Sequence, residues 1–279
     1  MKVIKTLKAM SAYTSKVRAA GKTIGFVPTM GYLHDGHLSL VEAAKNKAEV
    51  VIVSIFVNPT QFAAGEDLVT YPRNLKKDKK ALSNFDIDVL FLPSAEEMYP
   101  QGYKTFVQVE DLGKNLCGRS RPDHFRGVTT VVAKLFNIVA PHFAFFGQKD
   151  FQQLVIIKRM VKDLNVPVEI ISLPTVREYD GLAMSSRNKY LDKKQRQAAP
   201  VLYQSLLQAK EAIRSGEKDL HKVLAKIRSV IGKQPGIRID YAAAVDPETL
   251  VEAKTAKSPL LLALAAYVGR ARLIDNILL

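Results

Sequence analysis

Short β-forming runs alternate with segments of helical periodicity over the first two thirds of the chain. The runs, rich in Val, Ile and Phe, are TIGFVP at 23–28, VVIVSIFV at 50–57, VLFL at 89–92, FAFF at 143–146 and VEIISL at 168–173. Between them, apolar residues recur at helical spacing over 37–48, 74–84, 128–139 and 151–164. This alternation predicts an α/β fold, a Rossmann-like parallel sheet with helices on both faces.

The pattern changes after Leu173. Long helical patterns cover 193–214 and 219–231, and three β-like runs follow at 237–245, 260–268 and 271–279. We therefore predict two domains, a Rossmann-like one at 1–173 and a smaller α+β one at 174–279. The first 21 residues read as one amphipathic helix.

Composition narrows the class of protein. A chain of 279 residues with 47% hydrophobic residues is long and apolar enough to pack a globular core, which excludes disordered and fibrous proteins. A single cysteine, Cys117, excludes an internal disulfide and favours a reducing, cytoplasmic compartment. The longest apolar stretch is far shorter than the roughly 20 residues of a membrane span, and the lysine-rich N-terminus does not resemble a signal peptide.

The chain carries a formal net charge of +14, which raises the question of nucleic-acid binding. The excess is spread evenly, since residues 1–173 hold 23 basic and 16 acidic side chains and the remainder holds 18 and 11, so each part carries +7. The densest run, Lys76, Lys77, Lys79 and Lys80, is interpreted as a solvated helix face. We expect no nucleic-acid partner and no membrane partner.

Two loops follow buried strands and open helices, the arrangement that favours anion binding. The run from Pro28 to His37 places two histidines and two glycines where a helix begins, and unpaired backbone N–H groups there attract phosphate. Gly147 to Asp150 (GQKD) repeats the arrangement after another strand, with Lys149 to neutralise phosphate charge. The plain alternatives are histidines that only satisfy a helix start and an ordinary turn.

A third segment, Met184 to Arg187 (MSSR), follows the fifth strand. Its two hydroxyls and its guanidinium are suited to gripping phosphate oxygens.

The chain resembles the pantoate–β-alanine ligases, also called pantothenate synthetases, a family within the HxGH nucleotidyl-transferase superfamily. The resemblance rests on segments in both parts of the chain: PTMGYLHDGH at 28–37, FVNPTQF at 56–62, GEDLVTYPR at 65–73, HFRGVTTVVAKLFNIV at 124–139, FGQKDFQQL at 146–154 and MSSRNKYL at 184–191. It implies an ATP-dependent, AMP-forming condensation of (R)-pantoate with β-alanine, through a pantoyl-adenylate, to give pantothenate. It further implies a homodimer, in which residues 1–173 of each chain bind ATP and pantoate and residues 174–279 close over the site. Because ATP reacts as its Mg²⁺ complex, Mg²⁺ is expected without a dedicated metal ligand, and the reaction needs no protein nucleophile.

The resemblance also implies roles for individual residues. His34, His37 and Lys149 are the catalytic candidates; His37 is the usual candidate for proton donor, and a charged imidazolium would stabilise developing phosphate charge most. Gln61 is assigned to pantoate and β-alanine, and Gln153 to pantoate. The residues assigned to ATP are Met30, Gly31, Tyr32, Leu33, His34, Asp35, Gly36, His37, Gly147, Gln148, Lys149, Asp150, Val176, Met184, Ser185, Ser186 and Arg187.

Some interpretations stay open. His124 and Arg126 either face the substrate or anchor the helix that follows them, and Gly65 to Arg73 is a candidate flap that excludes water from the acyl-adenylate. Two rival functions are an adenylyltransferase that stops at a dinucleotide product and an RNA-binding module. The second needs clustered basic and aromatic residues, which the chain lacks.

Overall fold

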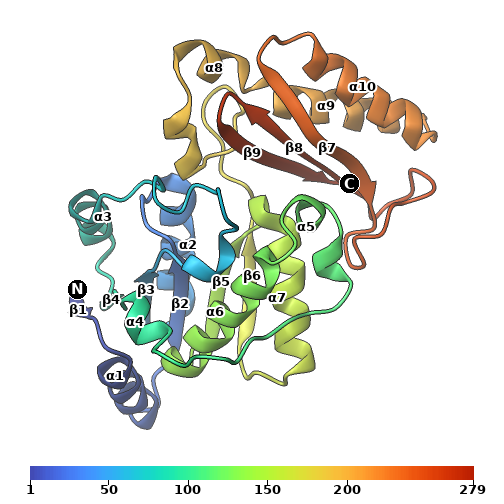
Figure 1. The fold of residues 1–279 in the computed structure, drawn as a ribbon. Coiled ribbons are helices and arrows are strands. Elements are labelled where there is room, and N and C mark those ends of the chain that lie inside the picture. Colours follow the sequence, from blue (N-terminus) through green and yellow to red (C-terminus); the bar gives the residue numbers. More distant parts are fainter.

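The computed structural model describes residues 1–279, and its larger sheet has six parallel strands (Figure 1). The strand order is β1-β4-β3-β2-β5-β6, and every neighbouring pair runs parallel. The strands are β1 (Lys2–Ile4), β2 (Ile24–Thr29), β3 (Val50–Ile55), β4 (Val89–Phe91), β5 (Phe143–Gly147) and β6 (Glu169–Leu173). The predicted parallel sheet is confirmed.

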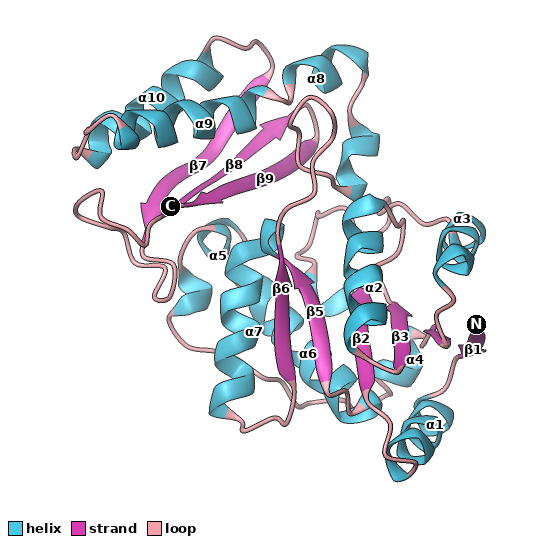
Figure 2. Ribbon diagram, turned by 180° about the vertical axis from the view of Figure 1, so that it is seen from behind, coloured by secondary structure: helices cyan, strands magenta, loops and turns pink.

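Helices cover both faces of this sheet, as Figures 1 and 2 show. Adjacent strand residues point to opposite faces, so Phe26 packs in a core with α6 and α7, whereas Val27 packs in another with α2. The helices of this part are α1 (Leu7–Ala19), α2 (Asp35–Lys47), α3 (Leu75–Leu82), α4 (Ala95–Met98), α5 (Cys117–Ser120), α6 (His124–Val139) and α7 (Phe151–Asp163). None of the chain's helices is long and apolar enough to span a membrane.

The C-terminal part contains an antiparallel sheet of three strands, in the order β7-β8-β9. Alternation along β8 gives this sheet two buried faces: Leu262 and Leu264 pack in the core of α9 and α10, and Leu261 and Ala263 pack in a cluster with Leu116. The elements are α8 (Lys193–Ala198), α9 (Val201–Arg214), α10 (Leu220–Gly232), β7 (Ile237–Val245), β8 (Leu261–Val268) and β9 (Ala271–Leu278). The sheet thus lies between its own helices and the larger sheet's domain (Figure 1).

Two predicted elements are wrong in detail. The single helix predicted over 193–214 is divided into α8 and α9 at Ala199 and Pro200, because proline has no N–H to continue the helical hydrogen bonds. The N-terminal helix begins only at Leu7, capped by Thr6, and is preceded by strand β1 at the sheet edge. Strand β1 has only three residues, too few to show the alternation that marks a strand in a sequence. Because β1 comes first, the predicted strand TIGFVP is the second strand of the chain.

Candidate active site

The HxGH loop leaves the carboxyl end of β2 through two residues with left-handed backbone. Gly31 and Tyr32 have φ of 82° and 52°. A Cβ at position 31 would lie 2.8 Å from Cγ2 of Ile55, so the loop passes close to β3 and only glycine fits without a shift. This passage places His34 at the N-cap of α2.

A buried aspartate from α3 holds the same loop. Asp78 is 2% exposed, and its two carboxylate oxygens accept the backbone N–H groups of Tyr32 at 2.9 Å and Leu33 at 2.8 Å. The sequence prediction treats the lysine run around Asp78 as a solvated helix face, which is correct for the exposed Lys76, Lys77 and Lys80 but not for the acidic residue between them. The feature of the sequence that could have indicated this role is a single acidic residue, Asp78, within a run of four lysines.

The two histidines lie against one another, with ring centroids 4.1 Å apart. Burial lowers the pKa of His34 to about 3, reinforced by His37 and Lys149, and it lowers the pKa of His37 to about 4, reinforced by Lys149. Both rings are therefore neutral near pH 7, so the charged imidazolium that would stabilise phosphate charge most is not their form in this structure. A neutral imidazole still donates one N–H, and the buried Nδ1 of His34 has no partner in the structure.

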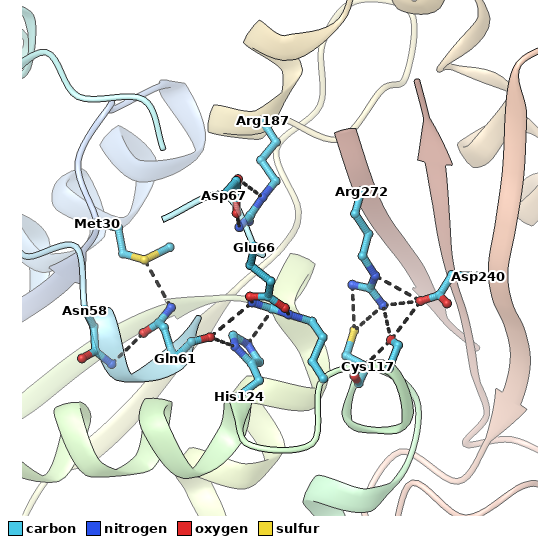
Figure 3. A network of polar contacts seen from close by, with 12 residues as sticks. Met30, Asn58, Gln61, Glu66, Asp67, Cys117, His124, Arg187, Asp240 and Arg272 are labelled. Atoms are coloured by element: carbon cyan, nitrogen blue, oxygen red, sulfur yellow. Dashed lines mark hydrogen bonds and ion pairs between the residues drawn. The ribbon is translucent and has the colours of Figure 1, made fainter. Parts of the chain in front are cut away.

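Gln61 belongs to a polar network at the end of β3, drawn in Figure 3. The side chain is 8% exposed; its Nε2 donates to Sδ of Met30 at 3.2 Å, and its Oε1 accepts from Nδ2 of Asn58 at 3.1 Å. Asn58 also donates to the backbone oxygen of Gly127 and accepts from the Tyr99 hydroxyl at 2.8 Å. These bonds fix the orientation of the Gln61 amide.

The HFRG segment, 124–127, is expected either to face the substrate or to anchor the helix that follows it, and its residues differ in this respect. Nδ1 of His124 lies 2.9 Å from the backbone oxygen of Gln61, whereas Arg126 stacks on Phe106 at 3.8 Å. Gly127 lies against the turn that carries Gln61: a Cβ there would come within 2.3 Å of the Thr60 backbone oxygen. The segment therefore anchors the Gln61 turn, and of its two polar side chains only His124 lines the main cavity.

The GQKD loop follows β5 and is held by the C-terminal sheet. Nδ2 of Asn276, on β9, donates to the backbone oxygens of Gln148 at 3.0 Å and Lys149 at 2.9 Å. The Lys149 ammonium lies 3.6 Å from a carboxylate oxygen of Asp150. Asn276 of the smaller sheet thus positions the GQKD loop, which carries Lys149 at the end of β5 in the larger sheet.

Neighbouring glutamines on α7 differ in role. Both line the cavity, but Gln152 is buried and bonds the backbone of Leu112, Asn115 and Cys117, whereas the predicted Gln153 makes no such bonds.

The MSSR loop contacts the HxGH loop directly. The Ser186 hydroxyl donates to the backbone oxygen of Tyr32 at 3.2 Å, and the backbone N–H of Met184 donates to the oxygen of Val176 at 3.0 Å. Lys149 of the GQKD loop lines the same cavity as Ser185 and acts electrostatically on both His34 and His37, so three predicted segments, distant in sequence, meet at one place.

The candidate flap, 65–73, is held by two ion pairs, drawn in Figure 3. Glu66 accepts two hydrogen bonds from Arg121, both 2.6 Å, and Asp67 accepts two from Arg187, both 2.9 Å. Burial acts to raise the pKa of Asp67, but the hydrogen bonds and charge of Arg187 outweigh it, and the pKa lies below its usual value. Asp67 also accepts the Tyr190 hydroxyl at 3.2 Å.

A cavity of about 630 Å³ lies between the two sheets' domains, with the flap along one side. Five of the predicted residues line it: Lys149, Asp150, Gln153, Ser185 and Arg187. His34, His37 and Gln61 are not among its lining residues. Glu66 and Asp67, in the predicted flap, also line it, whereas sequence reasoning missed the lining residues Arg121, Tyr190, Tyr241, Arg270 and Arg272.

Cys117 occupies a polar cluster at the wall of this cavity (Figure 3). Its sulfur lies 3.3 Å from the Tyr241 hydroxyl and 3.6 Å from two guanidinium nitrogens of Arg272. Arg272 also pairs with Asp240 at 2.7 Å. Burial raises the pKa of Tyr241 well above its usual value, so the hydroxyl stays protonated and available as a donor.

Comparison with known proteins gives a consistent family. The family model for pantoate-beta-alanine ligase matches residues 2–278. The chain is similar to the pantothenate synthetases of Moorella thermoacetica (53% identity, 100% of this chain and 99% of the relative) and Thermotoga petrophila (53%, 100% of each).

Solved structures agree with these matches. The crystal structure of pantothenate synthetase from Thermus thermophilus has a TM-score of 0.95 at 46% identity, covering 99% of each chain. The pantoate-beta-alanine ligase of Francisella tularensis, complexed with beta-gamma ATP and beta-alanine, has a TM-score of 0.81 at 37% identity, covering 100% of this chain and 97% of that one.

Proposed function

The chain belongs to the pantoate–β-alanine ligase family, and we propose that it condenses (R)-pantoate with β-alanine, using ATP, to form pantothenate. The structural observation that carries this proposal is the meeting of the HxGH, GQKD and MSSR loops at the carboxyl end of the parallel sheet, beside the cavity. Ligands of such sheets bind at that edge.

The reaction has two steps. The pantoate carboxylate attacks the α-phosphorus of ATP, so a C–O–P bond forms and pyrophosphate leaves. The β-alanine amine then attacks the activated acyl carbon; an amide bond forms, AMP leaves, and the amine loses a proton. No protein nucleophile is required, so the protein's contribution is positioning and the stabilisation of phosphate charge.

We assign His34, His37 and Lys149 to the reacting phosphate. The neutral histidines donate N–H bonds to phosphate oxygens, and Lys149 supplies the positive charge that they lack. The backbone of the HxGH and GQKD loops adds N–H donors at the starts of two helices. The remaining predicted ATP residues, in the MSSR loop and at Val176, complete the nucleotide site.

Gln61 and Gln153 are assigned to pantoate, and Gln61 also to β-alanine. An amide offers both a donor and an acceptor, which suits a substrate with hydroxyls and a carboxylate. Asn58, absent from the sequence prediction, supports this role by fixing the Gln61 amide.

Mg²⁺ is proposed to arrive as the complex with ATP. The structure groups no set of three or more His, Cys, Asp or Glu side chains that could hold a metal ion. Mg²⁺ is bound mainly through phosphate oxygens and waters in such complexes, where it would neutralise phosphate charge.

We further propose that residues 1–173 and 174–279 act as two domains that close over the cavity, with 65–73 as a flap that excludes water. The cores on either side of this boundary support the division, since the clusters of the parallel sheet draw on residues up to Met160 and the main C-terminal cluster starts at Leu182. A cytoplasmic location is proposed because both the single cysteine and the ATP requirement suit it.

The proposed homodimer has one supporting feature. Residues 104–109 form an extended segment on α6 in which Val107 bonds Thr129 and Thr130, while the backbone groups of its neighbours have no backbone partners. Such an edge is suited to pairing with a second chain. Light scattering of the purified protein tests this proposal, and a monomer at all concentrations would refute it.

Product analysis tests the function. The purified protein, given pantoate, β-alanine, ATP and Mg²⁺, should release AMP and pyrophosphate in equal amounts with pantothenate. Release of ADP and phosphate would refute the proposal, and a dinucleotide product would support the adenylyltransferase alternative.

A further inference from the structure

The cavity is lined by five cationic side chains, and one of them lacks an acidic partner. Four are paired with carboxylates within 4.0 Å: Arg121 with Glu66, Lys149 with Asp150, Arg187 with Asp67 and Arg272 with Asp240. Arg270 lines the same cavity and forms no ion pair. Its positive charge is therefore the one in the cavity wall that no carboxylate compensates.

The position of Arg270 is set by its neighbours. It lies at the tip of the β8–β9 hairpin, where Gly269 has a φ of 57° and packs so closely on Gln195 that a Cβ would lie 2.3 Å from its Nε2. The guanidinium carbon is 5.1 Å from the centroid of the Tyr190 ring. Stacking on an aromatic ring leaves the N–H groups at the guanidinium edge free to bind a ligand.

Tyr190 connects Arg270 to the remainder of the site. Its hydroxyl donates to Asp67, which is bound to Arg187, so Arg270 and Arg187 lie on either side of one tyrosine and one aspartate. His34 and His37, assigned to the reacting α-phosphate, do not line this cavity. Lys149, Ser185 and Arg187, which are assigned to ATP phosphates, line the cavity together with Arg270, so Arg270 faces the space into which the distal phosphates of ATP would extend.

We propose that Arg270 binds the β- and γ-phosphates of ATP from the C-terminal domain, and consequently binds the pyrophosphate that leaves. This inference rests on the proposed function. A polyphosphate carries several negative charges, and Lys149 and Arg187 do not compensate all of them. Arg270 adds a second arginine fork from the C-terminal part of the chain, beside that of Arg187, and so strengthens the link between nucleotide binding and domain closure.

The experiment compares Arg270→Ala with Arg238→Ala. Arg238 is a matched control because it is an exposed arginine on the same sheet, it stacks on Tyr267 at 4.2 Å, it forms no ion pair, and it does not line the cavity. Both variants remove one positive charge. Calorimetry gives the dissociation constants of ATP and AMP, and pantoate-dependent ATP–pyrophosphate exchange gives the KM of pyrophosphate.

We expect Arg270→Ala to raise the dissociation constant of ATP and the KM of pyrophosphate by about 10-fold, the effect of one charge-assisted hydrogen bond, and to leave AMP binding unchanged. Arg270→Lys should recover part of the loss, and Arg238→Ala should match the wild type. Equal ATP affinity in the two alanine variants, or an equal loss of AMP affinity, would overturn the inference. A wild-type chain without pantoate-dependent exchange would overturn the proposed function, and this inference with it.

Discussion

Asp67 accepts two parallel hydrogen bonds from the guanidinium of Arg187, each 2.9 Å long. The carboxylate belongs to the flap that follows β3, and the arginine belongs to the loop before α8, so the pair joins the two parts of the chain across the cavity. Arg187 is also the cation assigned to the ATP phosphates. Asp67 occupies the Nε and Nη2 donors of Arg187, so a phosphate that binds this guanidinium bidentately along the same edge competes with Asp67.

Replacing Asp67 with Asn should free Arg187 for phosphate. We expect the dissociation constant of ATP to fall by about 3- to 10-fold, because a competing anion is removed, while adenylation slows as the flap loses its anchor. Calorimetry and single-turnover formation of pyrophosphate measure the two effects. Glu66→Gln is the matched control, since it breaks the flap's other ion pair without touching Arg187; weaker ATP binding by Asp67→Asn would contradict the prediction.

Replacing Asp78 with Ala should destabilise the fold and the HxGH loop together. Two backbone N–H groups, of Tyr32 and Leu33, would lose their acceptor in a buried place, at a cost of about 2–4 kcal/mol in the free energy of unfolding. Urea denaturation measures this, and the KM of ATP should rise as well. Lys80→Ala, an exposed change on the same helix, should cost less than about 0.5 kcal/mol; similar losses in the two variants would count against the buried role of Asp78.

Acid should destabilise the protein through its buried histidines. The pKa values of His34, His37 and His124 are lowered to about 3, 4 and 4, respectively, by burial first of all. Between the ordinary imidazole pKa of about 6.5 and a pKa of about 4, the unfolded chain binds protons that the folded chain excludes, so the free energy of unfolding falls as pH falls.

The slope is at most roughly 1.4 kcal/mol per pH unit for each histidine. His37→Gln should therefore show a shallower loss of stability than the wild type over this range. His221→Gln, which changes an exposed histidine, should leave the slope unchanged. Parallel curves for the wild type and His37→Gln would show that His37 is not neutral in the folded protein.

Gly127→Ala should damage the Gln61 turn. The added Cβ would lie 2.3 Å from the Thr60 backbone oxygen, so the turn must move, and we expect the KM of pantoate to rise by about 10-fold with a loss of about 2–3 kcal/mol in stability. Steady-state kinetics and urea denaturation test this. Gly232→Ala is the control, because nothing lies within 4 Å of the Cβ it adds at the end of α10; an unchanged KM in Gly127→Ala would contradict the proposed support of Gln61.

Lys149→Ala should reduce adenylation far more than it reduces stability. Its ammonium is only weakly paired, 3.6 Å from Asp150, so its removal leaves no strongly bound partner uncompensated. We expect a fall of about 100-fold or more in the rate of pyrophosphate release, with a change in the free energy of unfolding below about 1 kcal/mol. Equal losses of activity and thermal stability would instead indicate a structural role.

The sequence by itself determined the parallel sheet and the loops at its carboxyl edge. Val50 to Ile55 is a strand because a run of β-branched residues buried on both faces suits a central parallel strand, and the helix-start positions of His34 and Lys149 follow from local turn chemistry. The order of strand, loop and helix depends on residues close together in the chain, so the periodicity of apolar residues predicts it. The sequence does not predict the short strand β1 or the break at Pro200, because each is a feature of a few residues beside a longer run with helical periodicity.

Only the tertiary structure decided which side chains meet across the site. Asp78 reaches the HxGH loop from 46 residues away, and Asp67 reaches Arg187 from 120 residues away. Neither partner is encoded by spacing, because such contacts depend on how helices pack and how the second sheet is set against the first. Burial decided the neutral state of His34 and His37 for the same reason: the cost of removing charge from water depends on everything that surrounds the ring, not on the residues beside it in the chain.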